Sequence, residues 1–347
     1  MIRNSLLLAA AAILWSSAAQ AQLPVKVVIV TTYEDDYLNP AATGTSHGEA
    51  RAWIDGFHLD TLMPLPAGFR PLRVNADGVM ETMTGMTTGK AAASTMALGL
   101  DPRFDFRKTY WILAGIAGVD PLQASQGSAA WAEWVVDGDI DNFVDPREIP
   151  AGWPDGHIPW DGTSALGPPG PNIGQMYHLN RRLVHWAFGL TRSMILPDNA
   201  KLRRSRAAFV GFPNGQRPPF VLIGDNLSSA TYWQGTKTAE WARRWVKLYT
   251  AGKGTFVTSS CEDSGFMQAM TFLGKAGKID PDRVLILRTA SDYCVPHPGE
   301  SSADSLKYDG THAYMGDSEA FESAYLVGGT VVRELIRHWD RYRDQVP

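Results

Sequence analysis

Short apolar stretches alternate with amphipathic stretches along most of the 347-residue chain. VKVVIVTTY at 25–33 and RVLILRTASDY at 283–293 begin with β-branched and apolar residues over the length of one strand, which is typical of buried strands. The other predicted strands are 109–118, 131–140, 218–226 and the first part of 255–277, which then continues as an amphipathic helix. The alternation and the Asp-Gly dipeptide of 69–85 predict a β-hairpin.

Helices are predicted at 89–100, 175–190, 237–250 and about 317–342. Within 237–250, Trp241, Trp245 and Tyr249 recur at a spacing of four, which favours a packed core over a ligand cage. Strands that alternate with helices indicate a single α/β domain.

Residues 145–175 are rich in proline and glycine and show no clear periodicity. This composition is typical of a long surface loop. We expect one domain over 22–347, with a Pro/Gly-rich insertion at about 145–215.

The N-terminus has the pattern of a secretory signal. Arg3 precedes an apolar run, and small residues then lead to Ala19-Gln20-Ala21, which resembles an A-x-A cleavage site. The run is short for a bilayer span, and no later stretch of the chain is long and apolar enough. We expect 1–21 to be a signal peptide and the mature chain to be exported, most simply to a bacterial periplasm, without a membrane span.

Composition excludes one class of partner. The chain is 44% hydrophobic and 20% charged, its net charge is −4, and it contains no run rich in lysine and arginine. Nucleic-acid binding therefore has no electrostatic support.

Three familiar motifs fail on inspection. GMTTGKA at 85–91 is one residue short of a P-loop and has Ala91 where a magnesium-binding hydroxyl is required. Ser291 lies in no G-x-S-x-G turn, so a serine hydrolase is disfavoured. His178 and His185 lack a third ligand nearby, so we expect no metal and no cofactor.

Acidic residues follow several of the predicted strands. They are Glu34, Asp225, Glu262 and Asp292. The carboxyl ends of parallel strands line the ligand crevice of an α/β sheet, so these acids are candidates for one site. For Asp225 a turn or helix cap is an equally good interpretation.

Five segments resemble, in order, the purine nucleoside phosphorylase and nucleosidase superfamily. They are TGMTTGKAAASTMALG, TYWILAGIAGVDP, VLIGDN, SSCEDSGFMQAM and LILRTASDY. The resemblance covers about 25–140 and 218–340 and is closest to the purine nucleoside permease branch. It implies a central mixed, largely parallel twisted sheet flanked by helices.

The resemblance also implies roles for single residues. Asp292 matches the acid that protonates or hydrogen-bonds purine N7, and Glu262 matches the glutamate that holds the ribose hydroxyls. Glu34 matches the position where nucleosidases place a carboxylate that holds the attacking water. The residues matched to site loops or to the base are Gly115, Ile116, Ala117, Gly118, Asp225, Asn226, Tyr232 and Trp233.

The departures from the superfamily bear on the nucleophile and the base. Phosphorylases carry arginines beside the first strand and before the glycine loop, whereas TTYEDDY has none and Leu113 precedes that loop. A phosphate trianion would face Glu34 and its acidic neighbours, so water is the favoured nucleophile. Leu227 replaces a base-stacking aromatic, which transfers base recognition to Tyr232 or Trp233.

Three functions therefore compete. The first is an exported purine nucleosidase that releases base and ribose. The second is a nucleoside-binding component of uptake that works with an uptake partner and does not turn its ligand over. The third is a phosphate-dependent phosphorylase. The sequence leaves open the base preference and whether the chain forms a homo-oligomer.

The two cysteines flank the candidate acids. Cys261 precedes Glu262, and Cys294 lies two residues after Asp292. In an oxidising compartment they could form a disulfide between neighbouring strand ends, or stay as two small buried thiols. Both alternatives remain open at this point.

Overall fold

The computed structural model describes residues 22–36, 47–311 and 316–347, and for 308–311 it describes the backbone alone. The expected signal peptide, 1–21, lies outside the described residues. The strands are β1 (Leu23–Pro24), β2 (Val27–Thr31), β3 (Thr61–Met63), β4 (Leu72–Val74), β5 (Val79–Met83), β6 (Phe104–Asp105), β7 (Tyr110–Val119), β8 (Ala129–Trp131), β9 (Trp134–Asp137), β10 (Asp141–Phe143), β11 (His157–Pro159), β12 (Met176–His178), β13 (Val221–Ile223), β14 (Asp225–Ser228), β15 (Phe256–Ser260) and β16 (Val284–Tyr293). The helices are α1 (Ala50–Phe57), α2 (Thr88–Gly99), α3 (Arg181–Thr191), α4 (Ala200–Ala207), α5 (Thr236–Tyr249), α6 (Asp263–Lys275), α7 (Ser302–Thr311), α8 (Asp317–Arg337) and α9 (Trp339–Tyr342).

The centre of the molecule is one mixed sheet, which confirms the predicted fold class. Its path runs β12-β9-β14-β15-β7-β2-β5-β4-β3, and β16 joins it beside β7. Strands β2, β5, β7 and β16 are parallel, while β15 pairs antiparallel with the far end of β7. These central strands are almost wholly buried because their side chains are apolar on both faces.

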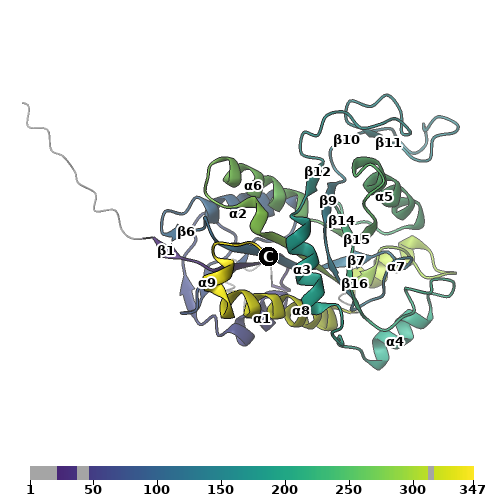
Figure 1. Cartoon of the computed structure of the whole chain (residues 1–347). Helices are drawn as coiled ribbons and strands as arrows, with labels where there is room; N and C mark the ends of the chain where they lie inside the picture. Colours follow the sequence, from purple (N-terminus) through teal and green to yellow (C-terminus); the bar gives the residue numbers. More distant parts are fainter. Residues whose placement is uncertain (1–21, 37–46, 312–315) are drawn as a thin grey trace, which may run out of the picture.

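Helices cover the sheet on two sides (Figure 1). On one side α8 packs on β16 and β7, with α1 and α3 beside it, and on the other side α2 packs against α6. Helix α5 covers β14 and β15 near the opposite end of the sheet. Its Trp241, Trp245 and Tyr249 are buried in a hydrophobic cluster with Leu227 and Phe256, as their helical spacing predicts.

Two predicted strands are each divided in two. The segment 131–140 begins with the last residue of β8 and contains all of β9, and 218–226 contains β13 and the start of β14. The first halves pair with each other and so do the second halves. The chain bends at Gly224, where a β-carbon would lie 2.3 Å from a methyl carbon of Val257, so only glycine fits. The apolar pattern continues across both bends because both halves are buried.

The helix predicted at 175–190 begins later than expected. Strand β12 occupies its first part, and α3 starts after Asn180, whose side chain accepts a hydrogen bond from the backbone N–H of Arg182. The expected insertion, 145–215, includes this strand, helices α3 and α4, and the hairpin partner β11. Within the described residues, no helix has the length and apolar character needed to cross a bilayer.

Candidate active site

A pocket opens at the carboxyl ends of the central strands, where a crevice is expected in an α/β sheet. Its free volume is about 70 Å³. Strands β7, β15 and β16 contribute residues to it, and so does the segment directly after β2. The lining residues are Thr32, Tyr33, Glu49, Met86, 116–118, Tyr232, 259–262, Ser291 and Asp292.

Asp292 lies in the wall of this pocket, as the sequence predicts, and only 5% of its surface is exposed. Between Ala290 and Asp292 the register of β16 on β7 shifts, so Ser291 is an extra residue. This bulge turns the carboxyl group toward the pocket. The Ser291 hydroxyl donates to Oδ1 at 2.8 Å. Burial raises the pKa of Asp292, and the hydrogen bond from Ser291 opposes that rise.

Tyr232 covers Asp292 on the pocket side. Its hydroxyl donates to Oδ2 of Asp292 at 3.0 Å, and its ring is 38% exposed. The prediction that Tyr232 belongs to the site agrees with this placement. Trp233 instead packs against Trp241 and Phe256 and does not line the pocket.

Glu262 lines the pocket at the start of α6 and is held from two sides. Its Oε1 accepts from the backbone N–H of Thr87 at 3.2 Å, and its Oε2 accepts from Nη2 of Arg288 at 2.9 Å. Each carboxylate oxygen keeps a second lone pair, so both can accept a further bond from a ligand.

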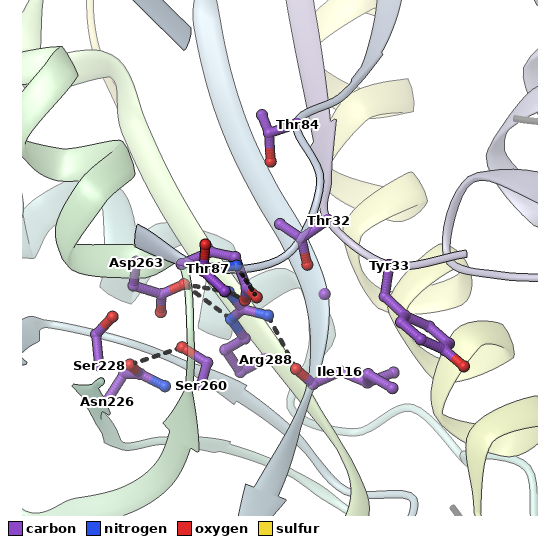
Figure 2. Close-up of polar contacts among 12 residues, drawn as sticks. Thr32, Tyr33, Thr84, Thr87, Ile116, Asn226, Ser228, Ser260, Asp263 and Arg288 are labelled. Atoms are coloured by element: carbon purple, nitrogen blue, oxygen red, sulfur yellow. Dashed lines mark hydrogen bonds and ion pairs between the residues drawn. The ribbon is translucent and has the colours of Figure 1, made fainter. Parts of the chain in front are cut away.

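Arg288 organises the floor beneath Glu262. Figure 2 shows its guanidinium between Asp263 and Ile116. It forms an ion pair with Asp263 and donates to the carbonyl oxygen of Ile116 at 2.9 Å. Burial alone would lower the pKa of Arg288, but attraction to Asp263 and Glu262 outweighs it and raises the pKa. This arginine therefore stays charged at the base of the pocket.

Glu49, like Arg288, is a site residue that the sequence did not predict. It lies directly before α1, and only 2% of its surface is exposed. Its Oε2 accepts from the backbone N–H groups of Thr32 and Tyr33 at 2.5 and 3.1 Å, and its Oε1 accepts from that of Ile116 at 2.7 Å. Burial raises its pKa to about 7, against the attraction of Arg288.

The sequence contains one weak signal for Glu49. ARAWIDGF, directly after it, forms a short amphipathic helix that is not among the helices predicted from the sequence. An acid at the start of such a helix is a candidate partner for nearby backbone N–H groups.

Glu34 does not reach the pocket. Its carboxylate forms a buried ion pair with Nε of Arg70, and its backbone bridges to Gly48. Burial raises the pKa of Glu34, and Arg70 opposes this. The acid that lies next to the segment matched to the glycine loop is Glu49, so the role matched to Glu34 has a better placed candidate.

Asp225 and Asn226 also lie away from the pocket. Asp225 begins β14 rather than ending a strand, and its carboxylate accepts from the backbone N–H groups of Trp134 and Thr255 at 2.9 and 2.6 Å. Burial raises its pKa to about 6. The side chain of Asn226 bonds to Thr258 and Ser260 on the neighbouring strand. Of the two interpretations of Asp225, the structural one fits, because its carboxylate stabilises the connection between β8 and β9 through the hydrogen bond from Trp134.

The residues matched to a glycine loop, 115–118, do not form a loop but lie inside strand β7. Ile116, Ala117 and Gly118 line the pocket. Gly115 does not, but a β-carbon there would lie 2.4 Å from Nη1 of Arg288. Gly115 is therefore required for Arg288 to pass beneath this part of the strand.

The two cysteines are free thiols, so the disulfide alternative is not realised. Cys261 lines the pocket and Cys294 is buried. Burial raises the pKa of Cys261 to about 12 and that of Cys294 well above its ordinary value. Neither is poised to act as a thiolate. Within the described part of the chain, no cluster of three His, Cys, Asp or Glu side chains could hold a metal ion.

Comparison with known proteins places these observations in a family. Residues 24–347 match the family described as purine nucleoside permease. A probable purine nucleoside permease of Schizosaccharomyces pombe is 30% identical over 309 residues, which are 84% of this chain and 87% of the relative. A purine nucleoside permease of Candida albicans is 29% identical over 274 residues, which are 75% of this chain and 65% of that protein.

Solved structures share the fold at low sequence identity. Futalosine hydrolase of Helicobacter pylori superposes with a TM-score of 0.54 at 13% identity and covers 90% of this chain and 98% of its own. A 5′-methylthioadenosine/S-adenosylhomocysteine nucleosidase from S. pneumoniae gives 0.53 at 15% identity, covering 90% and 100%. These similarities confirm the predicted nucleoside phosphorylase-like fold.

One prediction is corrected by the relatives. Both named permeases come from fungi, and fungal cells have no bacterial periplasm. The periplasmic location expected from the N-terminal segment is therefore wrong.

Proposed function

Because this chain belongs to the purine nucleoside permease family, we propose that it binds a purine nucleoside in the pocket at the carboxyl edge of the sheet and hydrolyses the bond between base and ribose. One observation carries the proposal. Two buried carboxyl groups with raised pKa values, Asp292 and Glu49, line the same pocket as Glu262. Groups that titrate nearer neutral pH are suited to proton transfer.

Asp292 is the proton donor in this mechanism. As the bond between C1′ and N9 breaks, negative charge develops on the purine, and a proton delivered to N7 neutralises it. Burial favours the protonated carboxyl group that this step needs. The hydrogen bond from the Ser291 hydroxyl to Oδ1 orients this carboxyl group.

Glu49 is the base for water. Three backbone N–H groups and the Thr32 hydroxyl fix its position. That hydroxyl is nearer to Oε2, at 3.1 Å, than to Oε1, at 3.4 Å, so Oε1 keeps a lone pair for a water proton. Water adds to C1′ as the purine leaves, so its proton passes to Glu49 while Asp292 gives its own proton to the base. The products are free purine and ribose, and proton exchange with solvent resets both carboxyl groups.

Glu262 and Tyr232 hold the two halves of the ligand. Glu262 accepts from the ribose hydroxyls while its ion pair with Arg288 holds it in position. The free volume of about 70 Å³ is small for a nucleoside, and the Tyr232 hydroxyl occupies the purine side of Asp292. We propose that Tyr232 turns aside on binding and stacks on the base, where relatives of the superfamily use another aromatic.

The other functions make different demands on the same pocket. Phosphorolysis needs a cation free to meet phosphate, whereas the one guanidinium at the described pocket, that of Arg288, is bound to two carboxylates and a carbonyl. Arg70, a second candidate, is paired with Glu34. A binding component of uptake is favoured by the names of the two fungal relatives and needs only the ligand contacts.

The test incubates the purified chain with inosine or adenosine, with and without phosphate. Free base, ribose and ribose 1-phosphate are separated and quantified, and nucleoside binding is measured by calorimetry in parallel. We expect equal amounts of base and ribose at a rate that phosphate does not change.

Each other outcome identifies a different function. Binding without release of base would support the uptake component and overturn hydrolysis. Ribose 1-phosphate as the main product would establish phosphorolysis. Absence of both binding and turnover with either nucleoside would overturn the proposed ligand.

A further inference from the structure

A second and larger cavity, with a free volume of about 600 Å³, lies against Asp292. We call it the outer cavity. Among the residues that the structure describes, Asp292 alone lines both the outer cavity and the pocket described above. Part of the lining of the outer cavity is apolar, because the rings of Phe209 and Tyr293 lie there in contact, with centroids 3.7 Å apart and planes tilted by 34°.

One face of α4 forms a wall of the outer cavity. Lys201, Arg204, Ser205 and Ala208 line it, and their spacing of three and four places them on one side of the helix. The positive charges are therefore directed to the cavity by the helical repeat.

These two cations have no hydrogen bond or ion pair with any described residue, although Lys201 exerts a longer-range attraction on Asp317. The other arginines of α4 differ. Arg203 and Arg206 both pair with Asp198, at 3.7 and 2.8 Å. Lys201 and Arg204 are thus the two that remain available for a ligand.

The acids around the outer cavity do not cancel this charge. Glu300 is one negative charge against the two of Lys201 and Arg204, and its carboxylate lies 3.5 Å from Nε2 of His297. Asp292 is held toward its neutral form by burial. The cavity therefore combines a partly apolar lining with a net positive wall, which suits an apolar linker that ends in an anion.

We propose that the outer cavity binds an anionic substituent carried by the purine base of the ligand, a carboxylate at the end of a short chain on the six-membered ring. This inference rests on the proposed function. With the ribose on Glu262 and the base edge on Asp292, a group that extends past Asp292 belongs to the base and not to the 5′ carbon. The anion then meets Lys201 and Arg204.

The test compares dissociation constants for adenosine, N6-succinyladenosine and adenosine 5′-monophosphate. N6-succinyladenosine should bind about ten-fold tighter than adenosine, as expected for two exposed ion pairs, and high salt should reduce the difference. The double variant K201A/R204A should lose this preference while it binds adenosine unchanged. R203A, which removes a neighbouring charge on another face of α4, should keep it.

Several results would overturn the inference. These are equal binding of adenosine and N6-succinyladenosine, a preference that persists in K201A/R204A, or a gain for the 5′-monophosphate that depends on the same two residues. In each case adenosine still binds, so the proposed function stands. Failure of all three ligands to bind would overturn the proposed function together with this inference.

Discussion

The position of one carboxyl group, that of Asp292, depends on a single extra residue in β16. The bulge at Ser291 lets the strand stay paired with β7 while Asp292 turns into the pocket. Asp292→Asn retains the shape and can still donate a hydrogen bond, but it cannot deliver a proton. We expect kcat for base release to fall roughly 10²–10⁴-fold while the dissociation constant changes little. Unchanged kcat, measured by release of free base, would leave Asp292 with a structural role.

The pair Glu49 and Glu34 gives a matched test at two nearby acids. Glu49→Gln removes the base, so we expect kcat to fall roughly 10²–10⁴-fold. Glu34→Gln should retain turnover but lower stability by about 3–5 kcal/mol, because it leaves Arg70 buried and unpaired. Turnover assays and urea unfolding of both variants distinguish the two roles. Loss of kcat in a folded Glu34→Gln protein would return the catalytic role to Glu34.

The unmodified chain should show the titration of Glu49 directly. Its base function needs the ionised form, and its pKa lies near 7. The rate at low substrate concentration should therefore rise as the pH passes through about 7. Above that pH, ionisation of Glu49 is complete and should raise the rate no further. A rate that is already maximal at pH 5 would show that no group of raised pKa acts as the base.

The site residues that could be identified from the sequence are those that lie at the end of a recognisable strand. Asp292 lies near the end of a strand that begins with an apolar run, and Glu262 follows a short strand after Cys261, so their placement in the crevice is predictable. Glu49 follows no strand, and its partners are backbone N–H groups, which leave no trace in the residue pattern. Asp225 has the pattern of a strand end, but the bend at Gly224 makes it a strand beginning.

Contact between α2 and α6 fixes the ribose side of the pocket. A β-carbon at Gly265 would lie 2.0 Å from the carbonyl oxygen of Thr88, so the two helices touch through their backbones. The neighbouring Thr87 N–H donates to Glu262 across the same contact. This arrangement joins helix packing directly to a ligand-binding carboxylate.

Gly265→Ala should therefore push the helices apart. We expect a loss of about 1–3 kcal/mol in unfolding free energy, together with weaker nucleoside binding as Glu262 loses a partner. Gly189→Ala in α3 is the control, since nothing lies within 4 Å of its β-carbon position. It should be stabilising by about 0.5–1 kcal/mol. Equal effects of the two substitutions on binding would contradict the role of this contact.

At the scale of elements, the sequence predicts which segments are strands better than it predicts their pairing. The division of 131–140 into β8 and β9 depends on neighbours distant in the chain, β13 and β14. The late start of α3 has a local cause, because Asn180 caps the helix. The spacing of apolar residues does not reveal this cap.

Across the whole molecule, several buried acids carry raised pKa values. The pKa is about 7 for Glu49, Glu81 and Asp317 and about 6 for Asp225, and burial is the largest cause for each. Unfolding returns each group to an ordinary value near 4. Between about pH 4.5 and 7 the folded chain therefore binds more protons than the unfolded chain. Its stability must fall as pH rises through that window.

Glu81 tests this dependence away from the pocket. It lies in β5, where the hydroxyl of Thr31 donates to it at 2.7 Å. A rise in pKa from 4.5 to about 7 corresponds to roughly 3 kcal/mol of stability lost once the group is ionised. Arginine partners lower the pKa of other acids, such as Asp101 and Asp198. Above pH 5 these acids are ionised in both the folded and the unfolded chain, so they do not change how stability depends on pH.

We expect Tm to fall steadily from pH 5 to pH 8 at constant ionic strength. Glu81→Gln, neutral at every pH, should show a shallower fall and a higher Tm than the unmodified chain at pH 8. A Tm that rises with pH over this range would show that these acids are ionised in the folded chain.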